Sequence, residues 1–199
     1  MDIYTDYGNW KFENHEFISN LVKNKSKTIS RFTPVITVVD YLYDKVCDNK
    51  KLSEDEEVIF SSGFDYIYDQ FHFIQTLLQF KFNNDYKRLE KNAKTINLLL
   101  FINEFIAEAL NYKNISTKEL DELESKVNAY LDKDEVVPDE YFAILDDITA
   151  KTFEANDIEV HTTDQIFYEI ALELGIYKDD DYNIYNEILN NQISKTRNK

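Results

Sequence analysis

The fold is decided by residues 53–111, which read SEDEEVIFSSGFDYIYDQFHFIQTLLQFKFNNDYKRLEKNAKTINLLLFINEFIAEALN. Apolar residues recur at spacings of three and four on both sides of Asn83-Asn84, which is typical of two amphipathic helices. The first apolar face consists of Phe60, Phe64, Ile67, Phe71, Ile74, Leu77, Leu78 and Phe82, and the second of Leu89, Ala93, Ile96, Leu99, Leu100, Ile106 and Leu110. The stretch therefore predicts a long antiparallel helical hairpin that turns at the two asparagines.

The remaining composition also favours helices. The 199 residues include only three glycines and two prolines, whereas sandwiches, barrels and Rossmann-type folds need many turn glycines. We predict an all-α, single-domain bundle of about seven or eight helices around the hairpin, spanning residues 1–199. The domain could also be divided into a hairpin-containing core at 1–111 and an acidic helical part at 112–199.

Several local signals predict where helices begin. Ser53 and Glu56 have the spacing of a capping box, and residues 116–119 repeat this pattern. Thr33 followed by Pro34 is typical of a capped helix start.

Other local signals predict helix ends and close contacts. Gly175 stands where a left-handed C-terminal cap is expected, and Gly63 predicts a kink or a close helix crossing. The run 158–161 predicts an extended connector, and residues 185–193 predict a last amphipathic helix.

The N-terminal segment and the cysteine are interpreted from composition alone. Residues 1–13 show no clear period, and we expect them to lie on the body through four aromatic anchors, Tyr4, Tyr7, Trp10 and Phe12. The lone Cys47 excludes an intramolecular disulfide and is interpreted as a buried structural thiol.

Charge is the strongest global signal. The formal net charge is −16, of which residues 1–111 carry −4 and residues 112–199 carry −12. The electrostatic field of so negative a chain repels phosphates, so direct binding of nucleic acid is disfavoured. The N-terminus lacks the pattern of a secretory signal and no apolar run reaches 18 residues, which favours a cytoplasmic protein without a membrane partner.

Two basic groups have alternative interpretations. Lys87, Arg88, Lys91 and Lys94 could bind an anion, but we favour the view that they neutralise neighbouring acids. The basic stretch 23–31 is interpreted as a solvated loop rather than a phosphate contact.

The chain has no recognisable catalytic motif. It lacks a glycine-rich phosphate loop, an HExxH pair, a nucleophile elbow and a Cys/His metal spacing, so the sequence favours a non-enzymatic protein without a cofactor. Lysine outnumbers arginine by 19 to 3 and Asn, Ile, Tyr and Phe are frequent, which is typical of a low-GC bacterium or its phages.

One group of residues could hold a metal. Asp65, Asp69 and His72 share one helical face, and the facing helix carries Glu104 and Glu108. Di-iron bundles use four carboxylates and usually two Glu-x-x-His pairs, however, and this chain offers a single Asp-x-x-His. We therefore favour a structural His72, polar or partly buried, over a metal ligand.

The candidate binding surface is acidic and lies after residue 111. Acids three and four apart on a helix lie about 5–6 Å from one another, which is comparable to the spacing of phosphates along a strand. An acidic helical surface can therefore enter the cleft of a nucleic-acid-binding protein, although the same acids also suit a surface that only confers solubility. The candidates are Asp121, Glu122, Glu124, Asp132, Asp134, Glu135, Asp139, Glu140, Asp146 and Asp147.

Three functions stay open at this point. The first is a non-enzymatic interaction protein with a basic protein partner, for example an inhibitor of the phage counter-defence or immunity type with a DNA-mimic-like surface. The second is a metal- or ligand-binding bundle enzyme. The third is a helical adaptor or a self-associating structural protein.

Overall fold

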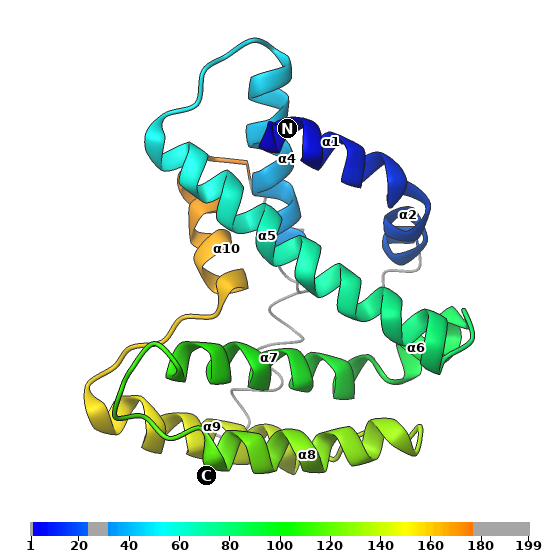
Figure 1. Cartoon of the computed structure of the whole chain (residues 1–199), viewed down its shortest axis with the longest axis vertical. Coiled ribbons are helices and arrows are strands. Elements are labelled where there is room, and N and C mark those ends of the chain that lie inside the picture. Colours follow the sequence, from blue (N-terminus) through cyan, green and yellow to red (C-terminus); the bar gives the residue numbers. More distant parts are fainter. Residues whose placement is uncertain (1, 24–31, 177–199) are drawn as a thin grey trace. The chain divides into compact units, whose positions relative to one another are not determined.

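The structure is a computed structural model that describes residues 2–23 and 32–176, and within these ranges every regular element is helical (Figure 1). The all-α prediction is confirmed. The basic stretch after Lys23 and the last predicted helix, at 185–193, lie outside the described residues.

The helices divide into two compact units. Of the described residues, unit 1 contains 2–23, 32–84 and 163–176, and unit 2 contains 85–162. The boundary therefore falls at the predicted Asn83-Asn84 turn, and the two arms of the predicted hairpin belong to different units. Each arm packs against other helices of its own unit.

Unit 1 is built around one central helix. It comprises α1 (Ile3–Glu13), α2 (His15–Lys23), α4 (Thr33–Cys47), α5 (Glu54–Thr76), a π-helical turn (Leu77–Lys81) and α10 (Thr163–Glu173). The helix α4 packs against both α5 and α10, which are separated by almost a hundred residues in the chain.

The core of unit 1 is aromatic. The ring of Tyr7 lies 5.5 Å from Phe60 and 5.2 Å from Phe64, and Trp10 lies 5.5 Å from Phe71. These contacts fix α1 on α5, because aromatic pairs in edge-to-face geometry add to the burial of their apolar surface. Three of the four predicted anchors, Tyr4, Tyr7 and Trp10, contact the core.

Gly63 marks a close helix crossing, as its position in α5 predicts. A Cβ atom at this residue would lie 2.6 Å from Cγ2 of Val39 on α4 and 2.8 Å from Cε1 of Phe167 on α10. The absence of a side chain therefore lets three helices meet at one point.

Unit 2 is a layer of helices along α7. It comprises α6 (Tyr86–Lys91), α7 (Ala93–Ala109), α8 (Lys118–Asp132), α9 (Glu140–Thr152) and a short 3-10 helix (Glu154–Asn156). The helix α7 runs beside α8 and α9, which also contact each other (Figure 1). Its core includes Ile96, Leu99, Leu120, Leu123, Val127, Phe142 and Leu145.

Two of the predicted helix termini are confirmed. Ser53 Oγ accepts the amide of Glu56 and the Glu56 carboxylate accepts the amide of Ser53, which completes the capping box. Gly175 has a φ of 66° after the end of α10, the left-handed conformation that suits glycine. The run 158–161, predicted as an extended connector, forms neither helix nor strand and lies just before the boundary with unit 1.

One predicted cap is wrong, and another differs from its prediction. The helix α8 begins at Lys118, one residue later than a cap at Ser116 implies. Ser116 Oγ accepts the Lys118 amide at 3.3 Å, whereas the Thr117 hydroxyl donates to Asp121 Oδ2 at 2.9 Å and caps no amide. The N-cap position of α4 is occupied by Phe32, so Thr33 is already helical and its hydroxyl does not cap. Pro34 still lies in the first turn, where its missing N–H costs nothing.

Three further predictions about burial are corrected, and one segment without a structural prediction is assigned. Residues 3–13, which show no clear period, form a helix. Phe12 is 84% exposed and Leu110 is 73% exposed, since each points away from its unit's core. Cys47 is exposed at the last position of α4, where the helix leaves the core.

Candidate functional site: an acidic interaction surface

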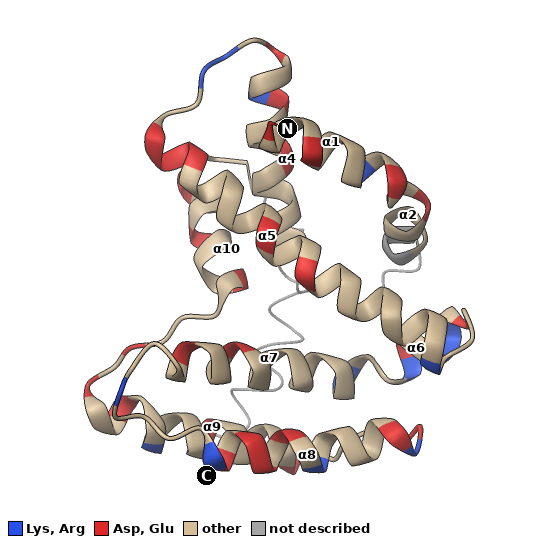
Figure 2. Cartoon of the chain, in the orientation of Figure 1, with Lys and Arg blue, Asp and Glu red and all other residues tan. Residues whose placement is uncertain are grey.

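The helix α8 presents acids to solvent because its leucine and valine residues are on the opposite face. Leu120, Leu123, Val127 and Leu131 are buried, and this leaves Asp121, Glu122 and Asp132 exposed, with Glu124 half-buried. Figure 2 shows the resulting acidic residues along α8, interrupted by lysines.

The helix α9 is arranged in a similar way. Phe142, Leu145 and Ile148 are buried, whereas Glu140, Asp146 and Asp147 are exposed together with one apolar residue, Ile144. Asp147 Oδ2 accepts a hydrogen bond from Lys151 Nζ at 2.5 Å, which raises the pKa of Lys151. One acid of α9 is thus partly neutralised within the chain.

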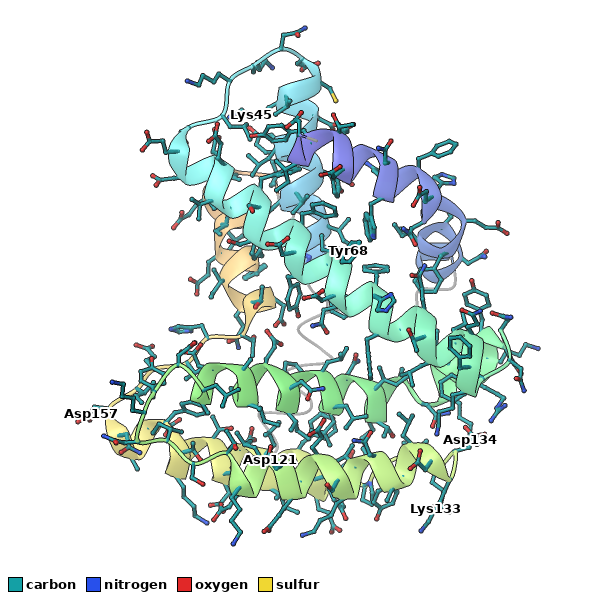
Figure 3. The ribbon with its side chains drawn as sticks, in the orientation of Figure 1. Lys45, Tyr68, Asp121, Lys133, Asp134 and Asp157 are labelled. Carbon is teal, nitrogen blue, oxygen red and sulfur yellow. The ribbon has the colours of Figure 1, made fainter. Side chains whose placement is uncertain are left out.

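Asp134 follows α8 and has a structural role. Asn92 Nδ2 donates to Asp134 Oδ1 at 2.6 Å, Arg88 Nε donates to Oδ2 at 3.3 Å, and Lys91 Nζ donates to the main-chain oxygen at 3.0 Å. The hydrogen bond from Asn92, with the charges of Arg88 and Lys91, holds the pKa of Asp134 below its usual range. This carboxylate therefore fixes the end of α8 to α6 and α7 (Figure 3).

A second set of contacts fixes the rest of the α8–α9 turn. Lys94 Nζ pairs with Asp139, and the Val137 amide donates to Thr95 Oγ1 at 3.0 Å. The prediction that the basic residues of 87–94 neutralise neighbouring acids is confirmed for Arg88, Lys91 and Lys94.

We predict that replacing Asp134 by asparagine destabilises unit 2 at neutral pH but has little effect in acid. The lowered pKa of Asp134 means that its stabilising effect is present above the unfolded-state value of about 4 and is lost as pH falls through the folded value. The measurement is thermal unfolding of D134N and the wild type between neutral pH and about pH 3. A difference in midpoint that does not shrink on acidification would contradict the role of the charge.

The eight candidates other than Asp134 and Asp139 are named the acidic surface. They lie on α8, on α9 and in the turn between them, and the exposed Lys118, Lys126 and Lys133 interrupt them. Residues 85–162 contain 18 acids and 9 bases, so unit 2 has a net charge of −9. The acidic surface consists of Asp121, Glu122, Glu124, Asp132, Glu135, Glu140, Asp146 and Asp147.

The five candidate metal ligands are divided between the units. Asp65, Asp69 and His72 are exposed on α5 in unit 1, whereas Glu104 and Glu108 are half-buried on α7 in unit 2. Within residues 2–23 and 32–176, no three or more His, Cys, Asp or Glu side chains gather into a possible metal site. Of the two alternatives for His72, polar or partly buried, the structure shows an exposed polar residue on the outer face of α5.

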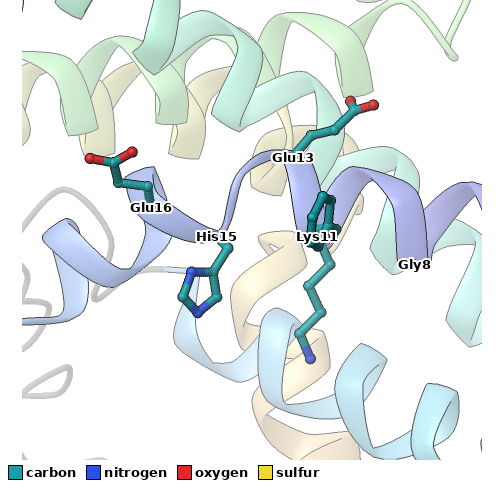
Figure 4. A pocket seen from close by; sticks show the side chains of 6 residues that line it. Gly8, Lys11, Glu13, His15 and Glu16 are labelled. Carbon is teal, nitrogen blue, oxygen red and sulfur yellow. The ribbon is translucent and has the colours of Figure 1, made fainter.

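Two hollows were not predicted from the sequence. One, of about 640 Å³, lies along α1 and the start of α2 and is wide open to solvent. Figure 4 shows Lys11 and His15 on one side of this segment, and Glu13 and Glu16 on the other. Lys11 Nζ is already 2.7 Å from Asp40, which reduces its capacity to bind a ligand.

The second hollow, of about 290 Å³, lies at the start of α8 in unit 2. Its lining is polar and includes Ser116, Lys118, Glu119 and Lys151. Both lysines are surface residues, and Lys151 is paired with Asp147.

The fold and the surface together define an acidic all-α protein. Comparison with protein-family models, curated proteins and solved structures finds no match to this chain. Across the part of the chain that the structure describes, no helix has the length and apolar character needed to span a bilayer.

Proposed function

We propose that this chain is a non-enzymatic interaction protein that binds a basic protein partner through the acidic surface of unit 2. The observation that carries the proposal is the distribution of charge within that unit. Four of the nine bases in residues 85–162 are used in ion pairs: Arg88, Lys91 and Lys94 with Asp134 and Asp139, and Lys151 with Asp147. The acids that remain on α8 and α9 therefore outnumber the bases available to neutralise them.

The arrangement of the acids suits a basic groove. Acids on successive turns of a helix are about 5–6 Å apart, and α8 and α9, which pack against each other, both carry exposed carboxylates. Complementary charge of this kind accelerates association and selects the partner. A nucleic-acid-binding protein has the required basic cleft, and occupation of that cleft would inhibit it.

Affinity capture with a matched bait tests this proposal. Two baits are used on lysate of a low-GC bacterium, at about 50 mM and about 300 mM salt. One is the wild type, and the other is a variant in which the corresponding amides replace Asp121, Glu122, Glu140 and Asp146. We expect the wild type to retain a basic protein at low salt only, and the variant to retain little of it at either concentration.

Two outcomes would contradict the proposal. If the captured proteins are the same for both baits, the acids do not determine binding. If capture persists at high salt, an apolar contact dominates, as expected of a helical adaptor.

A further inference from the structure

We infer that the tyrosine pair Tyr130 and Tyr141, between the end of α8 and the start of α9, receives an arginine side chain of the basic partner. This inference rests on the proposed function, because it names the group of the partner that the surface recognises. We name Tyr130, Tyr141, Glu135 and Glu140 the α8–α9 corner.

The two rings form one aromatic unit at the surface. Their centroids are 5.4 Å apart and their planes are inclined at 76°, so the rings meet edge to face and neither covers the face of the other completely. Both residues are half-buried, and each keeps part of its surface in contact with solvent. An aromatic face that is partly exposed attracts a cation through its quadrupole.

Two carboxylates accompany the rings. Glu135 and Glu140 are exposed, and neither forms an ion pair or a side-chain hydrogen bond within the described part of the chain. Both raise the pKa of Tyr130, after the larger effects of its hydrogen bond with Tyr141 and of partial burial. Their negative potential therefore extends to the phenol, where an incoming cation would neutralise it.

The corner is held in place before a partner binds. The Glu135 amide donates to the Tyr130 carbonyl at 2.9 Å, and the Tyr141 amide donates to the Pro138 carbonyl at 3.2 Å. The contacts of Asp134 with Arg88, Lys91 and Asn92 fix the turn between α8 and α9. A fixed turn lowers the entropy lost on binding.

The rings and the carboxylates favour arginine over lysine. A guanidinium is planar, so it stacks on an aromatic ring while its N–H groups bind a carboxylate. Unit 2 already uses a related contact internally, where Lys94 Nζ lies 5.9 Å from the centroid of Phe142 while pairing with Asp139. No cation of the described chain lies over Tyr130 or Tyr141, which leaves the corner available to a partner.

A hexa-arginine peptide is the probe for this inference. Binding is measured by titration calorimetry at about 50 mM salt, with hexa-lysine as the second arm. We expect E135Q/E140Q to weaken binding of hexa-arginine by about tenfold. The matched control E154Q/E159Q removes the same charge from exposed positions of unit 2 outside the acidic surface, and we expect a change of less than about twofold.

Variants of the rings separate recognition from packing. Y130F/Y141F keeps both aromatic faces and should bind hexa-arginine within about twofold of the wild type, whereas Y130L/Y141L should lose about fivefold. Thermal unfolding of each variant shows whether unit 2 is still folded. If Y130L/Y141L is unfolded, the comparison of E135Q/E140Q with E154Q/E159Q tests the inference in its place.

The outcomes distinguish the inference from the proposed function. Equal losses of affinity for hexa-arginine in E135Q/E140Q and E154Q/E159Q would contradict a specific role of the α8–α9 corner. They would still agree with an interaction driven by overall charge. Equal affinity for hexa-lysine and hexa-arginine would overturn the preference for arginine. No binding of either peptide at low salt would count against the proposed function itself.

Discussion

Replacing Gly63 by leucine is expected to lower the free energy of unfolding of unit 1 by at least about 3 kcal/mol, because overpacking at a helix crossing cannot be relieved locally. The first added atom alone would lie 2.6 Å from Val39 and 2.8 Å from Phe167. Val39 belongs to α4, which packs on α5, and Phe167 belongs to α10, which packs on α4, so either α4 or α10 must move. Trp10, the only tryptophan, lies in the core of unit 1, and its fluorescence during denaturant unfolding reports the effect.

Gly8 supplies the control within the same unit. A Cβ atom there would meet only the Tyr43 side chain, 2.5 Å from its hydroxyl, and this group is the far end of a side chain that can rotate. Gly8→Ala should therefore change stability by less than about 1 kcal/mol, because the gain in helix propensity offsets a small displacement. If G8A and G63L are equally destabilising, the cost arises from the loss of glycine in general and not from the three-helix crossing.

The local structure of the chain could be predicted where the signal is contained in a few neighbouring residues. The capping box of Ser53 and Glu56 is such a case, since both partners lie within one turn. At residues 116–119 the same residue types start a helix one residue later, because Thr117 already has helical backbone angles and Ser116 Oγ accepts the amide of Lys118. The pattern thus predicted the helix but not the geometry of its first turn.

Pairing between distant segments could not be predicted in the same way. The periodicity of 53–111 located two helices and the turn between them, but any apolar face can pack on any other. The structure places the first arm on α4 and the second on α8 and α9. The packing partner of each helix depends on all the apolar faces in the chain, and a hairpin of two consecutive helices is only the arrangement with the shortest sequence separation.

The same limit applies to the acidic surface. The sequence located the acids on α8 and α9, because amphipathic spacing shows which side faces solvent. It could not show that Asp134 pairs with Arg88, which precedes it by 46 residues. Nor could it show that Tyr130 and Tyr141 meet, because their contact depends on the path of the turn between the two helices.

Tyr7 is the position at which a change in α1 should have the largest effect. Its side chain is 1% exposed, and its hydroxyl donates to Asp40 Oδ1 at 2.5 Å while the ring contacts Phe60 and Phe64. Tyr7→Ala removes the ring and should cost about 3–5 kcal/mol, whereas Tyr7→Phe removes only the hydrogen bond and should cost about 1–2 kcal/mol. Denaturant unfolding followed by Trp10 fluorescence measures both values.

Alkaline pH separates the contribution of the hydroxyl from that of the ring. Burial, followed by the neighbouring charge of Asp40 and the hydrogen bond to it, raises the pKa of Tyr7 far above its ordinary value of about 10. The unfolded chain releases this proton above pH of about 10 while the folded chain retains it, so the hydroxyl's contribution is complete below that pH and decreases above it. The difference in stability between the wild type and Y7F should therefore narrow as pH rises past about 10.

Phe12, on the same helix, is the matched control because it is 84% exposed. Phe12→Ala should change the free energy of unfolding by less than about 0.5 kcal/mol, since an exposed ring contributes little to the core. A cost for F12A similar to that for Y7A would mean that α1 is stabilised by its own helical structure and not by its aromatic contacts. A pH-independent gap between the wild type and Y7F would instead show that the Tyr7 phenol does not remain protonated in the folded chain, and the hydrogen bond to Asp40 would then have to be abandoned.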